Sequence, residues 1–346
     1  MTSKKSRILI AAALLLCVTL IVGYSFYAKI FHANVKKSGT VYIPSNSNID
    51  DLKNILAPKL NDVDDFIWVA KKKKYHLNIK AGKYSITEGM STNDLINYLR
   101  LGKQNPVKLT FNNQHSLEAL AGRISKQIEA DSIAIFNAMT DEGFLKTNGF
   151  NEGTAISMYI PNSYQVYWNT SAEQFRTRML KEYNSFWNQN RISKAQQQNL
   201  TIEEVSILAS IVQQECQSNI SERAMVAGLY LNRYHKKWPL EADPTIIFAL
   251  KKENGQDYMV KRVLYKDLKI DSPYNTYKNR GIPPGPICMP DISSIEAVLN
   301  PVEHNYFFMC ASVERFGSHA FAKSLRQHNR NAKKYQKWIS KLGVNR

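Results

Sequence analysis

The feature that most constrains this chain is an uncharged apolar run close to its N-terminus. Residues 8–28, ILIAAALLLCVTLIVGYSFYA, are 21 residues without a charged side chain. A helix of that length extends about 31 Å, the thickness of one bilayer core. The run is too long for the apolar part of a cleaved signal peptide, and Tyr24, Phe26 and Tyr27 stand where small residues would be needed. We therefore expect an uncleaved transmembrane helix.

Charges on either side of this run indicate its orientation in the membrane. Basic residues flank it at Lys4, Lys5, Arg7, Lys29, Lys36 and Lys37. A short basic tail, residues 1–7, ahead of a long polar body favours a tail that stays in the cytoplasm. We therefore expect the chain from about residue 33 onward to lie outside the cytoplasmic membrane.

The composition describes a folded and strongly basic protein. A hydrophobic fraction of 44% over 346 residues favours domains with real cores over disorder. The chain has 46 Lys and Arg residues against 29 Asp and Glu, a net charge of +17. Such a balance favours polyanionic partners, which include nucleic acid, acidic lipid and anionic polysaccharide. The expected location outside the membrane argues against nucleic acid.

The body of the chain begins with two predicted strand–helix–helix–strand (βααβ) units. The first has strands at 39–43 and 81–86 and helices at 47–56 and 62–72, followed by a helix at 91–102. The second has strands at 107–111 and 158–168 and helices at 116–128 and 131–139. A unit of this size can bind glycan, but it can equally be a plain packing unit.

The segment TIEEVSILASIVQQEC, residues 201–216, predicts an amphipathic helix with one carboxylate on its apolar side. Thr201 and Glu204 have the spacing of a capping box, which places the helix start. An apolar stripe with helical spacing follows at Val205, Leu208, Ile211 and Val212. Glu215 continues this stripe at the helix end, where apolar surroundings and the helix dipole both raise the pKa of a carboxyl group. Glu215 is therefore a candidate general acid, and a structural glutamate paired with Arg or Lys is the open alternative.

A second helix is expected at about 220–235, and Asn219 and Glu222 again have capping-box spacing. After residue 238 the chain becomes rich in loops. The segment DSPYNTYKNRGIPPGP, 271–286, combines prolines and glycines that favour a rigid loop with the polar and aromatic residues Asp271, Ser272, Tyr274, Asn275, Thr276 and Tyr277. Such side chains suit the hydroxyls and C–H faces of a sugar. A structural loop is the alternative.

The four cysteines do not form a recognisable motif. Cys17 lies in the apolar run, and Cys216, Cys288 and Cys310 have neither CxxC spacing nor a histidine at ligand spacing. We therefore expect no disulfide framework and no zinc site. Cys216 directly follows Glu215, and we expect it to be a buried, inert thiol.

Several motifs in the second half of the chain occur in a recognisable order. They are LASIVQQE at 208–215, AGLYLNRY at 227–234, PLEADPTI at 239–246, DSPYNTY at 271–277, GIPPGPI at 281–287 and GSHAFAKSLRQHN at 317–329. Together they resemble the endolytic murein transglycosylases, the MltG/YceG-like family. The membrane helix and the N-terminal region resemble the layout of that family more loosely.

With the membrane helix, the resemblance implies an α+β fold with LysM-like βααβ modules and a mixed α/β catalytic domain rich in helices and loops. The expected domains are a cytoplasmic tail at 1–7, a transmembrane helix at 8–28, a LysM-like βααβ domain at 33–105, a second βααβ-like region with a connecting helix at 106–195, and a catalytic transglycosylase domain at 196–346.

The resemblance also implies an activity. The protein would be an endolytic peptidoglycan lytic transglycosylase that cuts the MurNAc-β-1,4-GlcNAc bond within glycan strands and leaves 1,6-anhydro-MurNAc ends. It would act on nascent strands and limit their elongation. Glu215 falls on the catalytic glutamate of the family, and no metal or organic cofactor is implied. Substrate-binding residues are expected at Glu241, Asp243, Asp271, Tyr274, Asn275, Tyr277 and His319.

Two alternatives remain open at this point. Glu241, where the family commonly has Gln, is a candidate second carboxylate, and its closeness to Glu215 would favour a muramidase that hydrolyses the same bond. A non-catalytic cell-wall-binding protein is the other. The expected partners are peptidoglycan glycan strands, the bacterial inner membrane through the single N-terminal helix, and, as candidates, peptidoglycan synthases.

Overall fold

The computed structural model describes residues 4–260, 262–315 and 317–341. Residues 1–3 of the expected tail and 342–346 of the expected last domain lie outside the described residues. The protein is a mixed α+β structure with an N-terminal apolar helix, as predicted. Its contacts divide the chain into two compact units. One comprises Met1–Leu109, Lys126–Ala130 and Tyr164–Ser171, and the other Thr110–Ser125, Asp131–Ser163 and Ala172–Arg346. The finer domain boundaries expected from the sequence stay a prediction.

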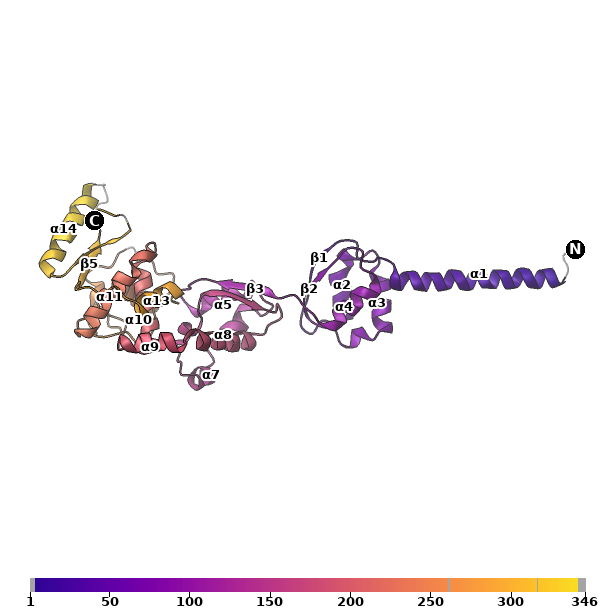
Figure 1. Cartoon of the computed structure of the whole chain (residues 1–346), viewed down its shortest axis with the longest axis horizontal. Helices are drawn as coiled ribbons and strands as arrows, with labels where there is room; N and C mark the ends of the chain where they lie inside the picture. The colour runs from indigo at the N-terminus through magenta and orange to yellow at the C-terminus, as the bar shows by residue number, and fades with distance from the viewer. Residues whose placement is uncertain (1–3, 261, 316, 342–346) are drawn as a thin grey trace. The chain divides into compact units, whose positions relative to one another are not determined.

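The apolar run forms helix α1, Lys4–Phe31, none of whose residues is buried. Its length and composition are sufficient to cross a membrane, as an anchor or as a signal sequence. Figure 1 shows α1 leading from the N-terminus to the helices of the first unit. The last turns of α1 pack on helix α3 (Val63–Lys72), where the rings of Phe26 and Trp68 stack with centroids 5.5 Å apart and Lys29 Nζ lies 2.6 Å from Asp65 Oδ1.

The first unit contains the predicted strand–helix–helix–strand order. It consists of β1 (Gly39–Ile43), α2 (Ile49–Leu56), α3 (Val63–Lys72), β2 (Gly82–Ile86) and then α4 (Thr92–Leu101). The two strands pair antiparallel, with Gly39 opposite Ile86. The side chains of Ile43, Leu52 and Phe66 meet in one core. This order confirms the predicted βααβ unit, whereas its LysM-like character stays a prediction.

The second predicted unit differs from the expectation in two ways. It comprises β3 (Val107–Phe111), α5 (Leu117–Ser125), α6 (Ser132–Met139), an additional helix α7 (Glu142–Thr147) and β4 (Asn162–Val166), and β3 pairs with β4. The strand expected from residue 158 begins at Asn162, because Ala155–Met158 form a buried 3-10 helix. A short buried apolar run has no periodicity that separates a strand from a helical turn.

From Ala172 onward the second compact unit is mostly helical. Its elements there are α8 (Ala172–Phe186), α9 (Gln189–Gln197), α10 (Ile202–Glu215), α11 (Arg223–His235), α12 (Asp243–Asn254), α13 (Ile292–Leu299), β5 (Phe308–Ala311), β6 (His319–Ala322) and α14 (Leu325–Lys341). Helix α10 packs against α9, α11, α12 and α13, and Figure 1 shows α9, α11 and α13 near it. Strands β5 and β6 form an antiparallel pair that packs on α14. The chain between α12 and α13 is mostly irregular, as predicted, whereas α12 itself is a helix that was not expected in the loop-rich stretch after residue 238.

Helix α10 is more deeply buried than its apolar stripe predicts. The predicted capping box is present, with Thr201 Oγ1 accepting from the amide of Glu204 and Glu204 Oε2 accepting from the amide of Thr201. Every residue from Val205 to Gln213 is buried, including three polar residues on the faces expected to be exposed. Among these, Gln213 accepts a hydrogen bond from the amide of Asp291 at 2.6 Å. Polar side chains of α10 therefore hydrogen-bond to neighbouring segments of the chain. The periodicity of the sequence alone does not reveal these contacts.

Candidate active site

A pocket of about 370 Å³ lies at the C-terminal end of α10. Helices α10, α11, α12 and α14, strands β5 and β6 and the segment around Tyr277 all contribute to its lining. Five residues predicted as catalytic or substrate-binding line this pocket: Glu215, Glu241, Asp243, Tyr277 and His319. The structure therefore brings together side chains that are up to about a hundred residues apart in the sequence.

Glu215 is the last residue of α10, as predicted, and its carboxylate is held by a tyrosine. The phenol of Tyr230, on α11, donates a hydrogen bond of 2.6 Å to Glu215 Oε1. Among the described residues, no Lys, Arg or His forms an ion pair with Glu215. The alternative of a structural glutamate paired with a basic residue is therefore not what the structure contains.

The pKa of the Glu215 carboxyl group is raised above its ordinary value, first of all because the group is desolvated. The hydrogen bond from Tyr230 and the charge of His319 lower this pKa, whereas the carboxylate of Asp243 raises it. Desolvation dominates, so Glu215 retains its proton at pH values where an exposed glutamate has lost it. A carboxyl group with this behaviour can donate a proton to a substrate at a higher pH than an exposed glutamate can.

Tyr230 is a functional candidate that the sequence analysis did not single out. Its side chain is only 1% exposed, and burial raises its pKa well above the ordinary value, so it remains a hydrogen-bond donor. A buried tyrosine needs a partner for its hydroxyl group. The sequence does show that Tyr230 lies in the helix that follows the one carrying Glu215. Nothing in the local sequence pattern shows which group the Tyr230 hydroxyl contacts.

Arg233 and Glu241 form an ion pair beside the pocket. Arg233 Nη1 lies 2.9 Å from Glu241 Oε2, and the same guanidinium donates to the carbonyl oxygens of Leu240 and Phe307 at 2.7 Å. The backbone of Glu241 has φ of 50°, a left-handed conformation that a non-glycine residue rarely adopts. Arg233 therefore fixes the segment that carries Glu241 and also holds its carboxylate.

Asp243 and Tyr277 are joined by a second short hydrogen bond. The phenol of Tyr277 donates to Asp243 Oδ1 at 2.6 Å, and the pKa of Tyr277 is raised, chiefly by burial and then by this bond. Asp243 is the first residue of α12, followed by Pro244. Each of these two side chains is therefore fixed in orientation at the pocket wall.

Three other predicted substrate-binding residues do not line this pocket. Asn275 is fully buried, and its amide donates to the carbonyl oxygens of Leu268 and Ile270 while its Oδ1 accepts from the amide of Tyr277. Tyr274 is buried against the ring of Phe248. Asp271 is exposed. Asn275 thus holds the loop that positions Tyr277, and direct substrate contact by these three residues stays an untested prediction.

His319 reaches the pocket from the first position of β6 and is held by Glu222. Its Nδ1 lies 2.6 Å from Glu222 Oε2, and its backbone amide donates to the same carboxylate at 3.0 Å. The predicted capping box of Asn219 and Glu222 is wrong, because α11 begins only at Arg223 and Asn219 makes no side-chain cap hydrogen bond. The carboxylate that would close the box binds His319 instead.

The cysteines agree only in part with the sequence analysis. Cys17, Cys216, Cys288 and Cys310 are all free, and burial raises the pKa of Cys216 to about 12, as expected of an inert thiol. However, the ligand atoms of Cys216, Glu222 and His319 lie within 4.8 Å of one another and could hold a metal ion. The spacing argument missed this group because its members belong to separate elements.

Comparisons with known proteins agree with one another. The sequence profile of the YceG-like family matches residues 41–334. The chain is 31% identical to the endolytic murein transglycosylase of Bacillus subtilis, over 91% of each protein. It is 29% identical to that of Streptococcus pneumoniae, over 86% of this chain and 58% of the relative. A crystal structure of a YceG-like protein from Listeria monocytogenes superposes with a TM-score of 0.56 at 29% identity, covering 85% of this chain and 98% of the other.

The raised pKa of Glu215 predicts a stabilising substitution. Because the folded state binds this proton more tightly than the unfolded state, the native protein loses stability as pH rises from 4.5 through the folded pKa. The loss is about 1.4 kcal/mol for each tenfold change in the dissociation constant. Glu215→Gln mimics the protonated form, so we expect its stability relative to the native protein to increase with pH across this window.

Urea unfolding of both proteins between about pH 4 and pH 8 measures this difference. Glu203→Gln, at an exposed position of the same helix, is the control and should show no such dependence on pH. A stability difference for Glu215→Gln that stays constant with pH would contradict the raised pKa.

Proposed function

The chain belongs to the YceG-like family, and on this premise we propose that it is an endolytic lytic transglycosylase of peptidoglycan. Its curated relatives carry the name endolytic murein transglycosylase. The observation that carries the proposal is the pairing of a desolvated, proton-retaining Glu215 with a pocket lined by polar and aromatic side chains. The bond cut is the MurNAc-β-1,4-GlcNAc bond within a glycan strand.

In the first step Glu215 acts as a general acid. Its carboxyl proton passes to the glycosidic oxygen, and the bond from that oxygen to MurNAc C1 breaks as an oxocarbenium-like state forms. Tyr230 remains hydrogen-bonded to Glu215 Oε1 and stabilises the carboxylate that results. The leaving sugar departs with a free hydroxyl group.

In the second step the same carboxylate acts as a base. It takes the proton from the MurNAc C6 hydroxyl, whose oxygen attacks C1 and closes the 1,6-anhydro ring, so Glu215 regains the proton that it lost. The nucleophile belongs to the substrate and has a high effective concentration, so no water needs activation. One carboxylate is therefore sufficient.

The contacts of Glu241 and Asp243 support a role for these residues in positioning the substrate and not as a second catalytic group. The carboxylate of Glu241 is paired with Arg233, and that of Asp243 accepts from Tyr277. Each carboxylate thus has a partner that holds it in place. Glu241 nevertheless lines the same pocket, and this is the one observation that favours hydrolysis by a muramidase.

The N-terminal helix α1 supports a proposal about where in the cell this reaction takes place. We propose that α1 anchors the protein in the bacterial inner membrane with the second unit on the outer side, where nascent glycan strands and their synthases lie. Cleavage there would limit strand elongation. The rings and charges that join the end of α1 to α3 support an anchor that is structurally continuous with the first unit.

The proposal predicts loss of activity on removal of the acid. Glu215→Gln has no proton to donate, so we expect release of muropeptide ends from sacculi to fall by about 10²–10⁴-fold. Glu203→Gln is the matched control and should retain native activity. Chromatography of the released fragments measures both. Equal release by the Glu215→Gln and native proteins would contradict catalysis by Glu215, and no release by the native protein would favour a non-catalytic wall-binding protein.

The proposal also predicts a shift in pH dependence. Tyr230→Phe removes the donor that stabilises the ionised Glu215, so the pKa of Glu215 rises and the alkaline limb of kcat/KM moves to higher pH. A hydrogen bond to a charged group is worth about 1.5–3 kcal/mol, which corresponds to a shift of about one pH unit or more. The control is Tyr234→Phe, because the Tyr234 hydroxyl donates its hydrogen bond to Glu204 and not to Glu215. An unmoved limb in Tyr230→Phe would contradict the role of this bond.

A further inference from the structure

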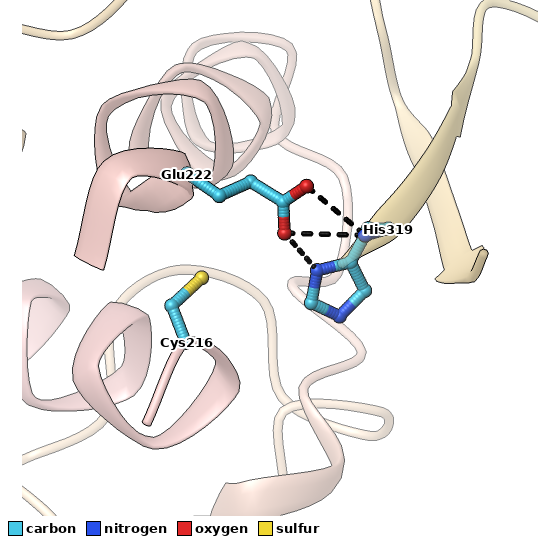
Figure 2. Close-up of side chains that lie close together, drawn as sticks. All are labelled: Cys216, Glu222 and His319. Carbon is cyan, nitrogen blue, oxygen red and sulfur yellow. Dashed lines mark hydrogen bonds and ion pairs between the residues drawn. The ribbon is translucent and has the colours of Figure 1, made fainter. Parts of the chain in front are cut away.

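Three side chains with different metal-binding atoms converge just beyond the C-terminal end of α10. Figure 2 shows Cys216, Glu222 and His319 directed toward one another, with Glu222 and His319 joined by hydrogen bonds. Their sulfur, oxygen and nitrogen ligand atoms lie within 4.8 Å of one another. Cys216 follows α10, Glu222 ends the 3-10 turn before α11, and His319 begins β6. The cluster therefore joins three separate elements.

The donor set is the one that zinc binds in proteins. Thiolate, carboxylate and imidazole ligands bind zinc at about 2.0–2.3 Å, so tetrahedral ligand atoms lie roughly 3.5 Å apart. A separation of up to 4.8 Å would have to shorten by about one ångström, whereas Glu222 Oε2 and His319 Nδ1, now 2.6 Å apart, would move slightly apart to admit the ion. Glu222 and His319 are already fixed against each other, which reduces the cost of ordering them.

The surroundings favour a cation. The cluster contains one carboxylate of its own, that of Glu222, and Cys216 directly follows Glu215 in the chain. The guanidinium of Arg223, which donates to the carbonyl oxygen of Cys216, is bound to the carboxylate of Asp291 at 2.7 and 2.8 Å. A divalent ion would balance the negative charge and stabilise the thiolate.

The cluster has a route to solvent. A second cavity of about 470 Å³ is lined by Glu222 and His319, together with Ser221 and Ser318. Cys216 is only 2% exposed and does not line this cavity. An ion can therefore enter from this cavity, and a water molecule can complete its coordination there.

We propose that Cys216, Glu222 and His319 form a zinc-binding site with water as the fourth ligand. Binding releases the thiol proton of Cys216 to solvent, and the proton on His319 Nδ1 also leaves, so that the imidazole keeps its single proton on Nε2. The hydrogen bond between Glu222 and Nδ1 is thereby replaced by two bonds to the metal. The ion ties the end of the helix that carries Glu215 to β6. This assignment rests on the positions of the three side chains and does not depend on the proposed function.

Cobalt(II) titration of the untagged, metal-free full-length protein in detergent tests the site. We expect one Co²⁺ per chain, with a near-ultraviolet band from thiolate-to-cobalt charge transfer that zinc abolishes by displacement. A zinc-dependent rise in the unfolding temperature should accompany binding, since a ligand specific to the folded state stabilises it. Absence of the band, or of binding near one ion per chain, would overturn the proposal.

Variants assign the ligands. Cys216→Ser should lose the charge-transfer band and bind zinc at least tenfold more weakly. Cys288→Ser, at another buried free thiol outside the cluster, is the matched control and should retain both. Glu222→Gln provides a second variant that keeps the thiol, and it should weaken binding while the band persists at higher metal concentration. A band that survives in Cys216→Ser would show that the metal binds elsewhere.

Discussion

The candidate site depends on one carboxyl group buried at the end of a buried helix. Desolvation of Glu215 opposes its ionisation, while the hydrogen bond from Tyr230 favours it, and the first effect is the larger. Because these two effects oppose each other, Glu215 can hold a proton and its carboxylate is still stabilised by Tyr230 after the proton leaves. This property is what a single acid–base catalyst requires, and the rest of the second unit keeps the group in that environment.

That environment is built from polar contacts between distant segments. Arg233 fixes the segment of Glu241, Tyr277 fixes Asp243, and Glu222 fixes His319. Each pair joins a helix to a loop or strand that periodicity cannot align with it. Pre-oriented side chains cost little to arrange when a substrate binds, so these pairs suit a site that positions a sugar.

Local patterns in the sequence predicted most of the elements, although not α7 or α12, and they did not predict all of the surroundings of these elements. The Thr201 capping box and the burial of Val205 and Leu208 were correct, because they depend on neighbours along one helix. The cap at Glu222 was wrong, because a distant histidine outcompeted the local backbone for its carboxylate. Tyr230 and the grouping of Cys216 with His319 were missed for the same reason: both depend on tertiary contacts. The order of the motifs predicted Glu215 as the candidate acid. Only the fold shows that the Asn275 side chain hydrogen-bonds to the backbone of its own loop.

The central claim is that one acid, with a nucleophile supplied by the substrate, completes the reaction. Mass spectrometry of the ends that the native protein creates in peptidoglycan, before and after borohydride reduction, tests it most directly. Ring closure predicts new MurNAc ends that lack one water and resist reduction. New ends that carry that water and are reduced by borohydride would show that water is the nucleophile, and they would contradict the account.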